Sequence, residues 1–458
     1  MSGKRQKNQL ELAFTAESRS EAPRAAEEGT EALVAKGEAE SPAVMERLME
    51  EVCERENCLR AWRRVKANQG SPGVDGRRIQ QFPEYLKQHW PGIREQLLSG
   101  KYKPQPVRRV EIPKPDGGMR KLGIPTVLDR LIQQAVLQVL QSRWDPTFSE
   151  HSYGFRPKRS AHKAVAKAQE YIVSGRRWMV DLDLEKFFDR VNHDRLMSAV
   201  GKRIRDQRVL RLIGAYLRAG VMENGLVSPT EEGTPQGGPL SPLLSNIVLD
   251  ELDQELERRR HCFVRYADDC NIYVRSRAAG KRVMASITGF LWQRLKLRVN
   301  AEKSAVARPQ ERKFLGFSFT AERQARRRIA PKAVLRFKQR IRELTRRTKG
   351  VHPGQLKELN AYLRGWQSYF GFCETPSVLA KLAQWIQRRI RATLWKQWKR
   401  GSTRYAELRR RGVGRDLAAQ TAGSSHGPWR LGKSPALNIA LPTTFLASLG
   451  LPSLTVRT

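Results

Sequence analysis

The chain has 458 residues, of which 85 are lysine or arginine and 46 are aspartate or glutamate, so its formal net charge is +39. That length allows two or three domains with a sizeable core. Such an excess of positive charge predicts a polyanionic partner or a strongly anionic surface. A membrane-surface protein is disfavoured, because no long apolar segment and no basic amphipathic anchor stands out near the N-terminus.

Five cysteines bear on the redox compartment. None of them forms a Cys-x-x-Cys pair, and their number is odd. Both features argue against a disulfide framework and against a structural zinc site. Because the N-terminus also lacks an apolar signal region, we expect a cytoplasmic protein with reduced thiols.

The N-terminal part changes character at about residue 42. Residues 1–42 are rich in Ala, Glu, Ser and Lys and hold few large apolar groups, so we expect them to be disordered. From Ala43 to Val65 apolar residues recur at helical spacing, and a turn-rich stretch at 68–76 ends the pattern.

Residues 100–125 predict a basic β-hairpin, with a Pro-Asp-Gly-Gly turn at 115–118. Residues 126–141 predict a helix, because their apolar residues fall on one face that would pack on the core. The loop at 153–157 then leads into a basic helix. Its Arg156 and Arg159 are interpreted either as nucleic-acid contacts or as solvated surface residues.

An apolar-alternating run at 178–189 carries the first pair of acids. Asp181 and Asp183 fall on one face of a predicted strand, because strand side chains repeat every two residues. Either carboxylate has the position to face a metal ion. The alternative is a strand with one wet face, which the sequence favours for Asp181.

The stretch 233–242 is rich in glycine and proline and opens an apolar helix. Its glycines allow the backbone to approach a ligand closely. We expect Ser241 to cap the helix, with Pro242 at the first helical position. An ordinary loop before a helix is the alternative.

The tetrapeptide Tyr266-Ala267-Asp268-Asp269 is the most informative feature of the chain. Apolar residues alternate on both sides of it, which predicts two short strands with the acids at their turn. Adjacent carboxylates repel each other, and a pair of divalent cations about 4 Å apart gives a reason for placing them together. A polar surface turn is the alternative.

From Pro331 onward the chain becomes strongly basic and predicts further helices at 356–366 and 378–398. Aromatic residues recur among these cations. They suit a nucleic-acid groove, but they suit the core of a helical bundle equally well, and for most of the tryptophans we expect the core.

Taken in order, these stretches resemble the sequence blocks of a reverse transcriptase. The resemblance is to the reverse transcriptase/maturase encoded by bacterial group II introns, and to its compact IIC class without an endonuclease domain. It runs from about Met45 to nearly the C-terminus, through blocks at 73–76, 112–118, 122–125, 153–157, 187–193, 300–304, 314–317 and 365–370.

The resemblance implies an α+β right-hand polymerase, with fingers and palm built on antiparallel sheet. An α-helical thumb and a small C-terminal domain follow. By this resemblance residues 43–320 form the reverse transcriptase domain, with an N-terminal extension, fingers and palm. Residues 321–400 form the thumb, or maturase domain X, and residues 401–458 form a DNA-binding domain.

The resemblance also implies the catalytic ligands. The family places its first catalytic Asp five residues before an aromatic residue. Asp183 fits, because Phe188 follows at that distance, whereas Asp181 would put Lys186 there. Asp183, Asp268 and Asp269, with the backbone carbonyl of Leu184, would then hold two Mg²⁺ ions, with Mn²⁺ as a substitute.

Other implied contacts concern the incoming nucleotide. Lys114 and Arg120 match the residues that hold its triphosphate, and Gln236 matches a residue lying along the nucleotide and template. A bulky ring at Phe188 beneath the sugar would clash with a 2′-hydroxyl and favour deoxynucleotides. Residues 314–317 resemble the primer grip, and Lys303 lies in a block near the site.

The implied partners are an intron RNA template, a DNA or RNA primer, target DNA and dNTPs, in a bacterial cytoplasm near RNA and nucleoid. Assistance to intron splicing rests wholly on the resemblance. The alternatives are a non-catalytic RNA-binding splicing factor, an RNA-dependent RNA polymerase, or a retron, CRISPR, diversity-generating or domesticated reverse transcriptase. Intact acids at the three positions argue against the splicing factor, since a purely binding protein has no need of repelling carboxylates.

Overall fold

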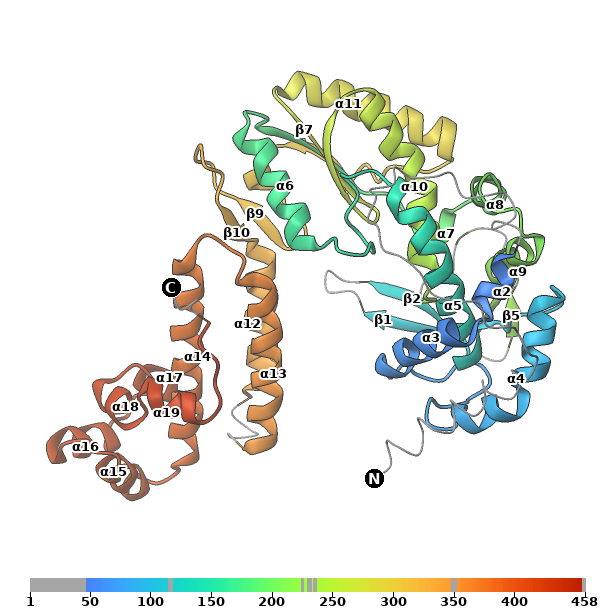
Figure 1. Cartoon of the computed structure of the whole chain (residues 1–458). Helices are drawn as coiled ribbons and strands as arrows, with labels where there is room; N and C mark the ends of the chain where they lie inside the picture. The colour runs from blue at the N-terminus through green and yellow to red at the C-terminus, as the bar shows by residue number, and fades with distance from the viewer. Residues whose placement is uncertain are drawn as a thin grey trace, which may run out of the picture. The chain divides into compact units, whose positions relative to one another are not determined.

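The computed structural model describes residues 47–113, 118–223, 226–228, 233, 237–346 and 352–454. The predicted disordered tail, Lys114 and Gln236 lie outside these ranges. The chain divides into two compact units (Figure 1). The first comprises residues up to 164 together with 179–306, and the second comprises 165–178 together with 307 onward. The domain borders predicted at 42, 320 and 400 stay predictions.

Two four-stranded sheets lie in the first unit. One has the order β2-β1-β4-β5, and its β1–β2 pair is antiparallel from Arg108 opposite Ile124 to Pro113 opposite Met119, which confirms the paired strands of the predicted hairpin. Residues 115–117 of its predicted turn lie outside the described residues. The other has the order β6-β7-β3-β8. The strands are β1 (Val107–Pro113), β2 (Met119–Ile124), β3 (Trp178–Leu182), β4 (Val221–Glu223), β5 (Leu226–Ser228), β6 (Cys262–Tyr266), β7 (Asp269–Val274) and β8 (Ala305–Ala307).

Helices of the first unit share one apolar core, from Leu48 to Leu297, with the sheet β6-β7-β3-β8. They are α2 (Leu48–Val52), α3 (Arg55–Ala67), α4 (Phe82–Leu98), α5 (Val127–Trp144), α7 (Phe187–Arg190), α8 (His193–Gly201), α9 (Gln207–Arg218), α10 (Ser241–Arg258) and α11 (Arg277–Phe290), with short turns η2 (Asp145–Thr147) and η3 (Leu291–Leu295).

Two helix starts bear on the sequence predictions, one on a predicted helix and one on a predicted cap. The helix predicted at 126–141 is α5, and the Thr126 side chain caps it by accepting a hydrogen bond from the Asp129 backbone N–H. The cap predicted for α10 is wrong by one position. Leu240 occupies the N-cap and Ser241 is already the first helical residue, so the Gly-Pro stretch ends one residue earlier than its sequence indicates.

The second unit is mainly helical. It holds most of α6 (Ala161–Val173), the short turn η4 (Pro309–Glu311), the antiparallel pair β9 (Phe317–Phe319) and β10 (Arg327–Ile329), and helices α12 (Pro331–Leu344), α13 (Pro353–Phe370), α14 (Pro376–Gln397), α15 (Gly401–Arg410), α16 (Arg415–Ala422), α17 (Pro428–Leu431), α18 (Pro435–Ala440) and α19 (Thr443–Ser448). No helix within the described ranges has the length and apolar character needed to cross a membrane.

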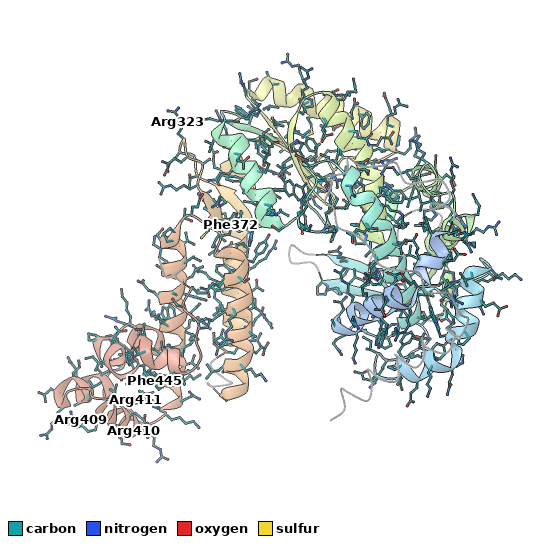
Figure 2. All side chains as sticks on the ribbon, viewed as in Figure 1. Arg323, Phe372, Arg409, Arg410, Arg411 and Phe445 are labelled. Atoms are coloured by element: carbon teal, nitrogen blue, oxygen red, sulfur yellow. The ribbon has the colours of Figure 1, made fainter. Side chains whose placement is uncertain are left out.

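The aromatic residues of the second unit lie mainly in its core, as the sequence favoured. Trp366, Trp395 and Trp398 are all buried. Cations cover the edges of this core: the Arg411 guanidinium lies 4.6 Å from the centroid of the Phe445 ring, at the end of α15 (Figure 2). Such contacts hold long basic side chains against the apolar surface while their charge stays hydrated.

Candidate active site

The two acids predicted at a turn lie at the closed end of a β-hairpin. Strands β6 and β7 pair antiparallel, and their last pair joins Tyr266 to Asp269. Ala267 and Asp268 therefore form a two-residue turn, which confirms the prediction. Ala267 has a φ of +56°, as the favoured two-residue hairpin turns require.

A second loop supports this turn from within the unit. The backbone of Tyr153 donates to the Arg265 carbonyl at 2.8 Å, which pairs the loop with β6. At Gly154 a Cβ atom would lie 2.3 Å from the backbone nitrogen of Ala267, so any side chain would displace the turn. The Asn246 amide donates to the Gly154 carbonyl at 2.9 Å and fixes the loop to α10.

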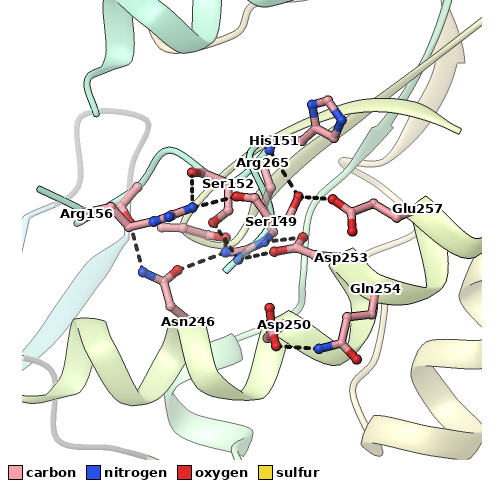
Figure 3. A network of polar contacts seen from close by, with 12 residues as sticks. Ser149, His151, Ser152, Arg156, Asn246, Asp250, Asp253, Gln254, Glu257 and Arg265 are labelled. Carbon is pink, nitrogen blue, oxygen red and sulfur yellow. Dashed lines mark hydrogen bonds and ion pairs between the residues drawn. The ribbon is translucent and has the colours of Figure 1, made fainter. Parts of the chain in front are cut away.

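Arg265 lies beneath the turn with its side chain fully buried, as does that of Asp253 on α10. The guanidinium holds the carboxylate in a bidentate pair, with Nε donating to Oδ1 at 2.7 Å and Nη2 to Oδ2 at 2.5 Å. Nη1 donates to Asn246 Oδ1 at 3.0 Å and to the Ala267 carbonyl at 2.9 Å. Nη2 also donates to Ser152 Oγ at 2.7 Å (Figure 3).

All five donors of Arg265 are thus directed to protein acceptors on three segments: helix α10, the supporting loop and the turn between β6 and β7. A buried charge is tolerated when it is paired and every donor is satisfied. The network therefore fixes the position of the turn that carries Asp268.

The prediction for Arg156 is wrong in both of its alternatives. The side chain is buried, and its Nε donates to Asp145 Oδ1 at 2.7 Å. It also donates to the carbonyls of Ser149 and Ser152, which shapes the supporting loop (Figure 3). Arg159 is only partly buried and donates to the Glu150 carbonyl at 3.0 Å.

Asp183 directly follows β3, the strand next to β7 in the sheet. It therefore lies beside the turn that carries Asp268. A segment at 298–304 fixes its backbone. The Asp183 N–H donates to Ser304 Oγ at 3.0 Å, and its carbonyl accepts from the Asn300 N–H at 2.9 Å. On the other side, the Glu185 N–H donates to the Arg298 carbonyl at 2.8 Å.

These flanking bonds make Leu184 and Val299 a facing pair that exchanges no hydrogen bonds itself. The Leu184 carbonyl is therefore directed away from the 298–300 segment. That orientation is compatible with its expected role as a backbone ligand.

Charges of both signs meet at the turn. Burial raises the pKa of Asp268, and the neighbouring negative charge of Asp183 raises it further, while Arg120 opposes the shift. The Lys303 ammonium lies 3.8 Å from Asp183 Oδ1. The structure thus brings Asp183 and Arg120 into electrostatic reach of Asp268, and Lys303 into reach of Asp183, from segments far apart in the sequence.

The donor set suits a hard divalent cation, since carboxylates and a backbone carbonyl all offer oxygen. No three His, Cys, Asp or Glu side chains in the described ranges form a complete metal site by themselves. Mg²⁺ does not require one, because it usually keeps waters and binds through one or two carboxylates plus substrate phosphates. The residues therefore fit a metal that is completed by the nucleotide.

Of the residues expected at the nucleotide, the structure describes Arg120 and Phe188. Arg120 is exposed on β2. Phe188 is half-buried in α7, and its ring meets that of the buried Phe187 edge-on at a centroid distance of 5.3 Å. Gly233 packs on the Phe188 carbonyl, where a Cβ atom would come within 2.8 Å.

Cys270 follows the acids directly but points into the core with 2% exposure, and burial raises the pKa of its thiol.

Arg265 and Asp253 were not identified from the sequence as residues that support the site. Their signal was present: each is a charged residue at an apolar-facing position of its element, and such residues need a partner of opposite charge.

A first prediction concerns the buried ion pair. Arg265→Lys keeps the charge but loses the two-pronged geometry, and Asp253→Asn leaves the guanidinium buried without its counter-charge. Each should lower the free energy of unfolding by about 3–5 kcal/mol, measured by denaturant titration. The control is Arg258→Lys, whose side chain is 70% exposed beside Glu255 and should change stability by less than about 1 kcal/mol. Equal effects at both sites would contradict the assignment.

A second prediction concerns pH. Asp250 lines a cavity of about 270 Å³, its Oδ2 accepts from Gln254, and its Oδ1 has no partner among the described residues. Burial, reinforced by the charge of Asp253, raises the pKa of Asp250 to about 6 from its ordinary 3.8. The folded state then binds an extra proton between these values, so this carboxyl costs stability as pH rises through that window.

Asp250→Asn removes the cost and keeps the shape. At pH 8 the free energy of unfolding of the variant should exceed that of the parent by about 1–2 kcal/mol. This is less than the full pKa shift implies, because the carboxyl borders a cavity where solvent can screen its charge. The gain should shrink at pH 5 and vanish near pH 3.8. A gain that is the same at pH 8 and pH 5 would refute the assignment.

Comparison with known proteins places this geometry in a family. Residues 112–319 match the family "Reverse transcriptase (RNA-dependent DNA polymerase)", and residues 334–412 match "Group II intron, maturase-specific domain". Protein YkfC of Escherichia coli K12 is 34% identical over 324 residues, which cover 62% of this chain and 84% of YkfC.

Group II intron-encoded protein LtrA of Lactococcus lactis is 46% identical over 163 residues, or 35% of this chain and 27% of LtrA, so the chain spans about a quarter of that relative. Among solved structures, telomerase from Candida albicans aligns with a TM-score of 0.40 and 14% identity, over 68% of this chain and 64% of that one.

The family matches confirm the expected right-hand polymerase. They also confirm that a maturase region follows the polymerase region along the chain. The chain belongs to the reverse transcriptases that group II introns encode, and is an RNA-directed DNA polymerase joined to a maturase region.

Proposed function

We propose that Asp183, Asp268 and Asp269, with the Leu184 carbonyl, carry the polymerase reaction of this family by binding two Mg²⁺ ions. The observation that supports it is the position of Asp183, which is held beside the Asp268 turn on a neighbouring strand and acts on the pKa of Asp268. Bound there, the metal would lower the pKa of the primer 3′-hydroxyl and steady the leaving pyrophosphate.

The protein's own groups position the reactants. The network around Arg265 keeps the turn rigid, so the carboxylates need not reorganise when the substrate arrives. Arg120 lies on a hairpin and offers a fork of donors to the triphosphate, together with Lys114. Lys303 offsets the charge of Asp183 before the substrate and its metal ions are bound.

The partners we propose are a template of intron RNA, a DNA or RNA primer, target DNA and dNTPs. The net charge of +39 supports polyanionic partners, and binding should weaken steeply as salt rises. The maturase region brings assistance to splicing. With nucleic acids as partners, we propose a location in the bacterial cytoplasm, close to RNA and the nucleoid.

The third prediction tests the catalytic set by primer extension on an RNA template with dNTPs and Mg²⁺. Asp268→Ala and Asp269→Ala should each slow extension by at least about 1,000-fold, because the interactions they lose stabilise the transition state. Binding of the RNA should be retained, as measured by filter retention. Full activity in both variants would reject a polymerase that works through these acids.

A matched pair separates the two acids after Trp178. Asp183→Asn should behave like the turn variants, whereas Asp181→Asn should keep most of the extension rate. Asp181 lies in β3 and Asp183 directly follows it, so a general disturbance of this strand end would affect both variants. Loss of activity in Asp181→Asn alone would move the ligand to that position.

The fourth prediction concerns sugar selection by Phe188. Phe188→Val should raise the use of rNTPs relative to dNTPs by about 10- to 100-fold, because a smaller side chain leaves room for a 2′-hydroxyl. The measurement is kcat/KM for each nucleotide on the same template. Phe188→Tyr is the control and should keep the preference for dNTPs, since it keeps the ring. An unchanged ratio in Phe188→Val would exclude this ring as the selector.

A further inference from the structure

The supporting loop contains an aromatic residue in an unfavourable backbone conformation. Phe155 has a φ of +59°, in the left-handed region that bulky residues rarely adopt. Such conformations persist where the surroundings impose them, and they gather at functional sites. The left-handed conformation of Phe155 therefore costs the folded loop some free energy, and it directs this one side chain.

The neighbours of Phe155 impose that conformation. Gly154 lies directly against the backbone of Ala267, and Arg156 is buried on the other side with its donors on Asp145 and the loop carbonyls. The Gln141 amide donates to the Phe155 carbonyl at 3.2 Å. With both neighbours anchored inward and its carbonyl held, the phenyl ring is directed outward.

The ring is 49% exposed, so its burial contributes little to the core. Its centroid lies 6.3 Å from that of Tyr266, with the two planes inclined by 46°. Tyr266 is the last residue of β6 before the turn that holds Asp268. Phe155 is exposed and Tyr266 is partly buried, and together their rings form an aromatic surface beside the turn that holds Asp268, which we call the ledge (Phe155 and Tyr266).

We propose that the ledge contacts the terminal base pair of the template–primer duplex, with Phe155 as a duplex-binding residue. The inference rests on the proposed function, since the Asp268 turn must lie where the primer ends. Aromatic rings stack on any nucleobase, and a polymerase must bind primer ends of any sequence. The contact therefore serves duplex binding and placement of the primer end, without base preference.

The test uses variants that tolerate a positive φ differently. Asparagine adopts the left-handed region readily and has no ring, so Phe155→Asn removes the ledge and relieves the backbone. Phe155→Trp keeps an aromatic face. The matched control is Trp292→Leu, because Trp292 is a similarly exposed aromatic residue of the same unit, at 47%, and does not belong to the ledge.

Duplex binding is measured without dNTPs, by anisotropy of a labelled RNA–DNA duplex with 2-aminopurine at the primer 3′ end. Phe155→Asn should raise Kd about 10-fold and abolish the change in 2-aminopurine emission on binding. Its Tm should match or exceed that of the parent. Phe155→Trp and Trp292→Leu should both keep the parent's Kd and emission change.

Three results would overturn the proposal: parental binding and emission in Phe155→Asn, equal losses in Trp292→Leu, or a fall in Tm that accompanies the weaker binding. The Asp268→Ala variant separates this inference from the proposed function. It should bind the duplex with the parental emission change while failing to extend it. A protein that shows the emission change but never extends would refute the polymerase assignment alone.

Discussion

The position of the turn that carries Asp268 depends on one buried guanidinium. Arg265 belongs to β6, and its charged side chain is fully buried against α10. Burial of this charge would cost much free energy if any of its donors lacked an acceptor. Its acceptors come from Asp253 and Asn246 on α10, Ser152 on the supporting loop, and the Ala267 carbonyl of the turn itself. Satisfying this one residue therefore requires three separate segments to meet in one arrangement.

Positive charge performs two different tasks in this chain. Arg265 and Arg156 are buried and direct their hydrogen bonds to groups of the protein, so they define the shape of the turn and of the supporting loop. Arg120 and Lys303 are exposed near the acids and are suited to anions that come and go. A net charge alone cannot distinguish these tasks, because burial decides which of them a given arginine performs.

Features set by local spacing were predictable from the sequence. The hairpin at the acids, the helix after Thr126 and the buried tryptophans follow from the periodicity of apolar residues, which depends only on near neighbours. Lys114 and Gln236 stay predictions, since both lie outside the described residues. Arg156 was misread because its partner Asp145 and the loop carbonyls approach it only after folding.

The choice between Asp181 and Asp183 shows the same limit. Periodicity places both on one face of a strand, and the preference for Asp183 came from a resemblance. What the structure adds is the segment at 298–304, more than a hundred residues away, which holds the Asp183 backbone on both sides. The spacing of residues within β3 could not predict that contact, because the segment approaches Asp183 only in the folded protein.

Cys270 gives the site a chemical property of its own. A thiol next to an active site ordinarily makes an enzyme sensitive to peroxides and alkylating agents, because its thiolate reacts with them. Here the sulfur is enclosed by the core, and its burial suppresses ionisation. Oxidants and alkylating agents should therefore spare this sulfur, even though it belongs to the next side chain after the acids.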